Sequence, residues 1–170
     1  MTSAQEVNTS KEKKGDDPTT PAAVSFKYIG VHPCKGCHNR KSKGDQYKKW
    51  KQSGHAEAYR VLAGTKAKEI ASKLKIGDPQ QAPACLKCHT TAYGSDRLGP
   101  MFKPEDGVQC ETCHGPGSRY RYSMKNRKKS LKNGLVLPKE KLCRTCHNDE
   151  SPTFKGFDFQ EMFTKITHNK

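Results

Sequence analysis

Apolar residues are sparse along this chain, and they recur at helical spacing in only a few short segments. The first is predicted to be a helix from about Gln46 to Ala63, with Asp45 as its cap and Gly54 as a weak point. Its apolar stripe consists of Tyr47, Trp50, Ala58, Tyr59 and Leu62. We expect the ordered part of the chain to begin earlier, near Phe26.

Three later segments carry weaker helical patterns, separated by Gly- and Pro-rich stretches that predict loops. A short helix is predicted from Lys66 to Lys75. A basic helix is predicted from Ser118 to Lys132, ended by Asn133-Gly134, with Tyr120, Met124 and Leu131 on one face. The apolar side of a last helix is formed by Phe157, Phe159, Met162, Phe163 and Ile166.

The composition supplies too little apolar material for an ordinary core. Only 32% of the 170 residues are hydrophobic and the mean hydropathy is −0.98, whereas a typical globular domain is nearly half apolar. Three interpretations follow: disorder, a disulfide scaffold, or a fold organised around something other than amino acids. No apolar run of about 18 residues predicts a membrane span.

The cysteines decide among these interpretations, because all eight fall in four pairs and His follows every pair. The segments are Cys34-Lys35-Gly36-Cys37-His38, Cys85-Leu86-Lys87-Cys88-His89, Cys110-Glu111-Thr112-Cys113-His114 and Cys143-Arg144-Thr145-Cys146-His147. This Cys-x-x-Cys-His pattern is the attachment motif of haem c. Two thiols three positions apart form thioethers with the porphyrin vinyl groups, and the adjacent imidazole binds the iron as its proximal ligand.

A single Cys-x-x-Cys is typical of a zinc knuckle or a redox dithiol, but neither needs His after every pair. The sequence therefore predicts four haem c cofactors, with His38, His89, His114 and His147 as proximal ligands. Buried porphyrin replaces the missing apolar side chains, at about 25 cal/mol per Å². We expect a mainly α protein with little regular secondary structure, organised around a four-haem stack, that is unfolded without haem.

The unmodified chain carries a formal charge of +15. Each haem contributes about −1 when ferric and −2 when ferrous, so the holoprotein carries roughly +7 to +11. This predicts redox partners with acidic docking surfaces and salt-sensitive encounters. Nucleic acid is disfavoured as a partner because the lysines are scattered and no nucleic-acid-binding motif occurs.

Haem c is attached outside the bacterial cytoplasm, which predicts a periplasmic or extracellular location. The first segment has no apolar region typical of a signal peptide, so no signal peptide is visible in this chain. Residues 1–25 are interpreted as a disordered polar tail or tether, and residues 26–170 as the tetrahaem domain.

The distal ligand of each iron determines what the iron does. Outside the motifs the chain has three histidines, His32, His55 and His168, so at least one of four irons lacks a distal His from this chain. His55 lies between Gly54 and Ala56, which leave room for a haem face, whereas His32 is too close to the first motif to serve that motif's own haem. Met124 is a fourth candidate, although its place on the predicted helical stripe favours a core role.

Beyond the motifs, the sequence resembles the tetrahaem cytochromes of the c554 type, which accept electrons from hydroxylamine oxidoreductase. The resemblance lies in Trp50 through Ala56, in the string from Gly107 to Gly117, and in Phe157 to Met162 before His168. It implies that His55 and His168 are distal ligands and that the haem of the second motif has none.

The family also has a distal His in the segment after Cys-His-Gly-Pro-Gly, but residues 118–132 here contain no His. This departure implies that His32 or Met124 takes over, that a partner subunit supplies the ligand, or that a second iron is open.

Three functions follow, and the sequence favours the first: a relay of electrons between redox partners, with no catalytic side chains. The second is binding or reduction of nitric oxide, nitrite or hydroxylamine at an open iron, that of His89. The third is an extracellular filament in which His32 ligates a haem of the next molecule, and thus self-association through His32.

Overall fold

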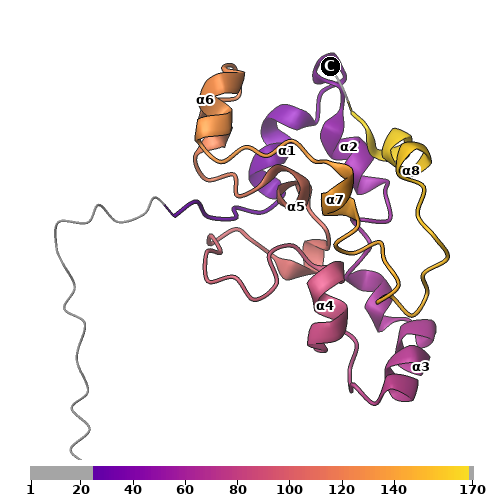
Figure 1. Cartoon of the computed structure of the whole chain (residues 1–170). Helices are drawn as coiled ribbons and strands as arrows, with labels where there is room; N and C mark the ends of the chain where they lie inside the picture. Colours follow the sequence, from indigo (N-terminus) through magenta and orange to yellow (C-terminus); the bar gives the residue numbers. More distant parts are fainter. Residues whose placement is uncertain (1–24, 169–170) are drawn as a thin grey trace, which may run out of the picture.

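A computed structural model describes residues 25–168 as a set of short helices joined by turns (Figure 1). The α-helices are α1 (His32–His38), α2 (Gln46–Lys51), α3 (Thr65–Leu74), α4 (Pro83–His89), α5 (Cys110–His114), α6 (Arg127–Lys132), α7 (Glu140–Cys143) and α8 (Phe159–Ile166). The 3-10 helices are η1 (Lys41–Lys43), η2 (Arg60–Ala63), η3 (Pro104–Asp106) and η4 (Tyr120–Tyr122). The predicted tail at residues 1–25 lies almost wholly outside the described residues.

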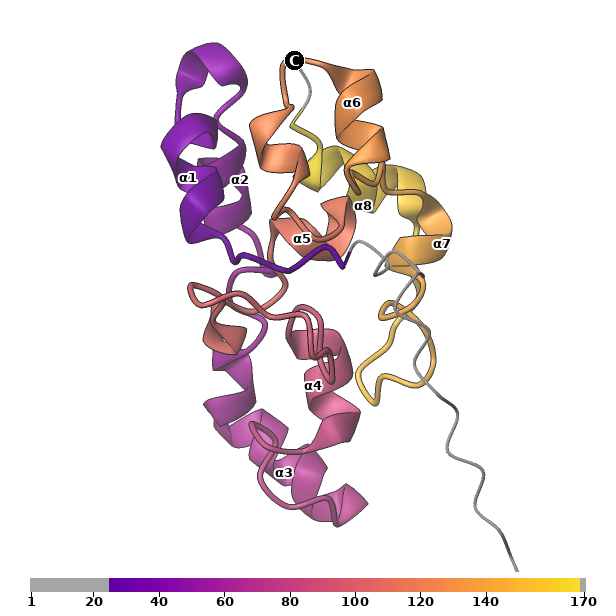
Figure 2. The same cartoon turned by 90° about the vertical axis from the view of Figure 1, so that its left-hand side faces the viewer.

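The helices divide the molecule into two halves in both views (Figures 1 and 2). One half holds α1, α2, α6 and α8, the other holds α3 and α4, and α5 lies between them. Within residues 25–168 the β pairing is limited to an isolated parallel bridge between Tyr28 and Leu98. The prediction of a mainly α chain with little regular secondary structure is confirmed.

The single helix predicted over residues 46–63 is wrong, because α2 ends at Lys51 and turns lead to η2. Beyond Gly54 the backbone makes tighter contacts, such as the 3.3 Å bond from the Ala58 N–H to the His55 carbonyl. That carbonyl also accepts a bond of 2.9 Å from Val108, which draws the chain toward the third motif. The predicted cap is also absent, since the Asp45 side chain makes no capping bond.

The segment before α5 approaches the turn at His55 so closely that it requires glycine at position 107. Gly107 has φ +72°, and a Cβ there would lie 2.7 Å from the His55 carbonyl oxygen, closer than real Cβ atoms come. The indole N–H of Trp50 donates to the Val108 carbonyl over 2.8 Å and closes the same junction. These contacts hold the turn that carries His55 against the chain entering α5.

The other helical predictions fare differently. The helix predicted at Lys66–Lys75 is confirmed within one residue as α3. The last helix is confirmed as α8, which is capped by the Asp158 carboxylate accepting from the Glu161 N–H over 2.8 Å. The helix predicted over residues 118–132 is wrong, because η4 and α6 are separated by a turn at residues 123–126.

The protein has almost no core made of side chains. Its buried hydrophobic residues, within the described range, are Val31, Ala56, Ala58, Leu62, Ala71, Ala82 and Tyr120, of which four are alanines. The largest fully buried side chains are polar: Gln109, Glu111, Thr91 and Ser130. Among residues 25–168, twelve large hydrophobic residues are exposed instead, so the polypeptide leaves its apolar groups without a common interior. None of the helices described in residues 25–168 has the length and apolarity to cross a membrane.

Candidate haem sites

Each Cys-x-x-Cys-His motif lies on or directly beside a helical turn. The first three motifs end α1, α4 and α5, and the fourth begins at the last residue of α7. Residues three apart share one face of a helical turn, so the two thiols of a motif lie on the same side. All eight cysteines are free of disulfides, as haem attachment requires.

Three of the four motif histidines are oriented through Nδ1 by an oxygen acceptor. His38 meets Gln46 Oε1 at 3.2 Å, His89 meets the Ala58 carbonyl at 2.5 Å, and His114 meets the Val136 carbonyl at 3.2 Å. With Nδ1–H donating, Nε2 keeps its lone pair for a metal. His147 is held differently, by stacking on Phe157 with ring centroids 4.7 Å apart and planes 15° from parallel.

Two of the predicted distal histidines each face a motif histidine. The ring centroids of His55 and His147 lie 6.0 Å apart, and those of His114 and His168 lie 5.9 Å apart. An iron bound between two imidazoles, with metal–nitrogen bonds of about 2 Å on each side, puts the ring centres about 6 Å apart. Both pairs therefore have the spacing that a haem iron needs.

Burial lowers the pKa of His55, and the nearby His147 lowers it further. Burial also lowers the pKa of His114, which outweighs the opposite effect of its bond to Val136. A lowered pKa keeps imidazole neutral, and the neutral form is the one that binds metals. His168 is held by a 2.9 Å contact between Nδ1 and the Ile166 carbonyl, which again leaves Nε2 available.

His168 lies beyond the end of α8, so its direction is not set by helical periodicity. The helix ends at Ile166, and Thr167 turns the chain with φ −60° and ψ 132°. The Lys49 ammonium donates to the Thr167 carbonyl over 2.8 Å and fastens this segment to α2. The half-buried imidazole that follows is thereby brought to His114.

Cysteines of different motifs lie next to one another. Contact with Cys110 lowers the pKa of the Cys34 thiol, and contact with Cys34 raises that of Cys110. Burial and then the Cys146 thiol raise the pKa of Cys88 to about 11. These contacts place the first motif beside the third and the second beside the fourth.

The third and fourth motifs are also neighbours. Burial raises the pKa of Cys113 to about 11, and the thiols of Cys143 and Cys146 contribute to that shift. An ion pair between Lys87 in the second motif and Glu150, just past the fourth, strengthens the junction of those two. The motifs therefore form one series in space, in the order first, third, fourth, second.

A buried carboxylate joins the third motif to the chain that leads into the first. Glu111 is 1% exposed, and it accepts backbone hydrogen bonds from Ile29 at 2.9 Å, Gly30 at 2.7 Å and Gly117 at 2.6 Å. Burial raises its pKa, although the three N–H donors act in the opposite direction. Glu111 thus fixes how the helical turn of the third motif lies relative to that of the first.

Neither of the two remaining predicted ligands, His32 and Met124, faces the imidazole of a motif histidine among the described residues. His32 is exposed at the start of α1, where it lines a surface hollow of about 500 Å³ together with other residues of that helix and Asn39. Met124 is 45% exposed and lies on the turn between η4 and α6, so its predicted place on a helical core stripe is wrong.

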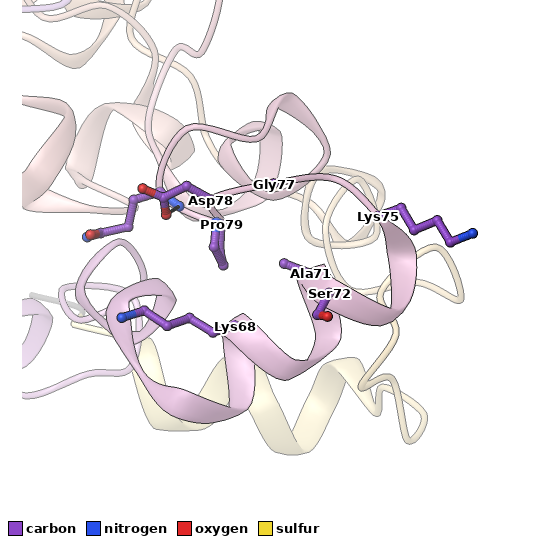
Figure 3. Close-up of a pocket in the computed structure, with 8 residues that line it drawn as sticks. Lys68, Ala71, Ser72, Lys75, Gly77, Asp78 and Pro79 are labelled. Carbon is purple, nitrogen blue, oxygen red and sulfur yellow. Dashed lines mark hydrogen bonds between the residues drawn. The ribbon is translucent and has the colours of Figure 1, made fainter.

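A second hollow, of about 440 Å³, lies between α3 and the loop that follows it (Figure 3). Lys68, Ser72 and Asp78 are among its lining residues, which include neither Cys nor His. It is separate from the four motifs.

Sequence reasoning missed the residues that orient the motif histidines. Gln46 and the carbonyls of Ala58 and Val136 lie 8, 31 and 22 positions from their partners, so no local pattern marks them. Glu111 occupies one of the two positions of its Cys-x-x-Cys-His motif that can be any residue, so the motif gave no sign of its structural role. Phe157 was expected on the last helix but precedes α8 and stacks on His147.

Comparison with known proteins bears on the fold and on the family. A family model described as cytochrome c554 and c-prime matches residues 33–115. Cytochrome c-554 of Nitrosomonas europaea is 29% identical over 154 residues, covering 79% of this chain and 63% of that protein's length. The structure of the reduced state of cytochrome c554 from the same organism matches with a TM-score of 0.60 and 25% identity, over 85% of this chain and 86% of that chain.

The four motifs, the facing imidazoles and the fold define a multihaem c-type cytochrome. Within that class, the chain is similar to the tetrahaem cytochromes of the c554 family. It carries four c-type haems.

Proposed function

We propose that this protein is an electron carrier that passes single electrons between redox partners. The observation that carries the proposal is the pair of imidazole–imidazole spacings, 6.0 and 5.9 Å, which suit six-coordinate irons that exchange electrons without binding a substrate. The haems supply the redox chemistry. The chain's own residues attach them, orient their ligands and set their order.

The attachment residues are proposed to be Cys34, Cys37, Cys85, Cys88, Cys110, Cys113, Cys143 and Cys146. The proximal ligands are His38, His89, His114 and His147. We assign His55 as the distal ligand of the fourth-motif iron and His168 as that of the third, on the strength of their facing rings. The neutral imidazoles favoured by burial support both assignments.

The contacts among cysteines support a single series of redox centres along the protein. The first and third motifs meet at Cys34 and Cys110, and the fourth and second meet at Cys146 and Cys88. Cys113 of the third motif lies within electrostatic reach of Cys143 and Cys146 of the fourth. The ends of the series are then the first and second motifs, which lie in opposite halves of the molecule (Figure 2). A donor and an acceptor docking at different halves would meet different ends of the series.

The second-motif iron is proposed to be five-coordinate. His89 is anchored by Ala58, and among the described residues no ring contact pairs it with a second imidazole. The comparisons do not favour the two other functions considered from the sequence, reduction of a nitrogen oxide and an extracellular filament.

The partners are proposed to be proteins with acidic docking surfaces, because the holoprotein carries roughly +7 to +11. The site of action is proposed to be outside the cytoplasm, where haem c is attached.

A reductive titration of the matured protein, followed by electron paramagnetic resonance, tests the proposal. We expect four electrons per chain to be taken up and returned reversibly. The oxidised protein should show at least two low-spin irons with two histidine ligands. Uptake of fewer electrons, or high-spin signals from all irons, would refute it.

A further inference from the structure

The first-motif iron has no imidazole on its distal side within this chain. The chain has seven histidines, of which four belong to motifs and two, His55 and His168, face other motifs. The seventh, His32, is the first residue of α1, the helix that ends at the motif's own His38. It is exposed to solvent, and its helix prevents it from reaching the other side of the same haem.

The segment that follows the third motif lies against the first motif. The Lys27 N–H donates to Ser118 Oγ over 2.9 Å, and the Ser118 N–H donates to the Lys27 carbonyl over 3.1 Å, so the segment is tied to the chain entering α1. Tyr120 and Arg121 then come within electrostatic reach of Cys34. Both views place the turn before α6 in the half of the molecule that holds α1 and α2 (Figures 1 and 2).

The turn at Met124 is held by two buried serines. Ser130 Oγ donates to the Ser123 carbonyl over 2.7 Å, and the two hydroxyl oxygens lie 3.2 Å apart. The amide of Asn133 donates to Ser123 Oγ over 3.1 Å. The backbone next to Met124 is therefore fixed by polar contacts, while Met124 itself is 45% exposed.

The other side chains of this turn region suit the iron less well. Tyr120 is buried and donates its hydroxyl to the Gly115 carbonyl over 3.1 Å, and burial raises its pKa. Lysines near neutral pH carry a proton and have no free lone pair. A thioether is neutral at every pH, and Met opposite His is an established haem ligand set.

We propose that Met124 is the distal ligand of the haem attached at Cys34 and Cys37. This inference rests on the proposed function, since it requires haem at the first motif. It makes the first iron a His–Met centre with a higher potential than the two bis-histidine centres. Electrons would then collect at the α1 end of the series, where a partner could remove them.

The test compares the wild-type holoprotein with M124L, M124H and the matched control M162L, whose residue is 37% exposed on α8. Wild type and M162L should show a strongly upfield-shifted Met methyl signal in the reduced protein by NMR and a sulfur-to-iron charge-transfer band in the oxidised protein. M124L should lose both, and should gain one high-spin iron and one bound carbon monoxide per molecule. M124H should restore a low-spin iron at a lower potential without the methyl signal.

Haem content and total electron uptake, measured on the same samples, separate this inference from the proposed function. Four reducible haems without a Met signal in wild type would overturn the role of Met124 and leave the carrier function standing. Unchanged spectra in M124L would also overturn the role of Met124 and leave the carrier function standing. A first iron that becomes low-spin only at high protein concentration would likewise overturn it, because that result would indicate ligation by His32 of a second molecule. Absence of the haems would refute the proposed function itself.

Discussion

The carboxylate of Glu111 accepts a 2.7 Å hydrogen bond from the backbone N–H of Gly30, across 81 positions of sequence. This contact and its companions to Ile29 and Gly117 hold the first and third motifs together. In a protein with so few buried hydrophobic residues, a buried carboxylate that satisfies three backbone donors has a disproportionate structural role.

Replacing this carboxylate should destabilise the holoprotein. In E111Q the amide keeps one acceptor oxygen but turns an NH₂ group toward backbone N–H donors, leaving a buried donor unsatisfied. We expect the free energy of unfolding of E111Q to be about 1–3 kcal/mol lower than that of wild type. Denaturant titration measures this difference. The control is E105Q, on the exposed surface of η3. Equal stability of the two variants would contradict the structural role of Glu111.

The same residue gives a pH dependence with a definite sign. Burial raises the folded-state pKa of Glu111 above the ordinary 4.5, so the folded protein binds more protons than the unfolded chain between those two values. Its contribution to stability is then full below pH 4.5 and is lost as pH rises through the folded pKa. The stability difference between wild type and E111Q should shrink with rising pH over that window. If the stability difference between wild type and E111Q instead grew with pH, the pKa of Glu111 would be lowered in the folded protein, contrary to this prediction.

Each facing imidazole pair should be separable by mutation. H55A should remove one low-spin signal, that of the fourth-motif iron, and H168A should remove the signal of the third. Each variant should also bind one additional carbon monoxide, because a coordination position has been opened. H32A is the matched control and should leave the spectrum of the monomer unchanged. Retention of every low-spin signal in H55A or H168A would disprove that pairing.

The positive charge should appear in the kinetics of electron exchange. Attraction between this protein and an acidic redox protein is screened by salt, so the bimolecular rate should fall by about tenfold or more between low and high ionic strength. Stopped-flow mixing measures this rate, with an uncharged small-molecule donor as the control whose rate should not change. A rate to the acidic partner that is insensitive to salt would argue against electrostatic docking.

Haem removal should abolish the fold. The described residues bury only seven hydrophobic side chains, four of them alanines, which is too little apolar area to offset the conformational entropy of the chain. A chain produced without haem attachment should therefore show a circular dichroism spectrum without helical signal and no cooperative unfolding. Cooperative unfolding of that apo-chain would show that the polypeptide has a core of its own.

The sequence predicts the chemistry of this protein better than its local structure. Cys-x-x-Cys-His is a local pattern with a local chemical cause, so all four motifs could be identified without coordinates. The helix predicted over residues 46–63 failed because the His55 carbonyl pairs with Val108, a contact between distant segments that periodicity does not report. The helix over 118–132 failed for a local reason, since Ser123 and Ser130, seven positions apart, bond to each other across a turn.

For the distal ligands, too, the sequence supplies the candidate residues and the fold supplies their pairing. The sequence offered His32, His55, His168 and Met124 as candidate distal ligands, but only the fold brings His55 to His147 and His168 to His114. His168 lies after α8 and not on it, so no helical-wheel argument could have directed it to His114.

The central claim is that four haems are covalently bound to this one chain and form its interior. Intact-mass spectrometry of the matured holoprotein, under denaturing conditions that remove non-covalent groups, tests it most directly. We expect a polypeptide heavier by four haem masses. A mass equal to that of the bare chain, on a sample matured with a functional haem-attachment system, would contradict it.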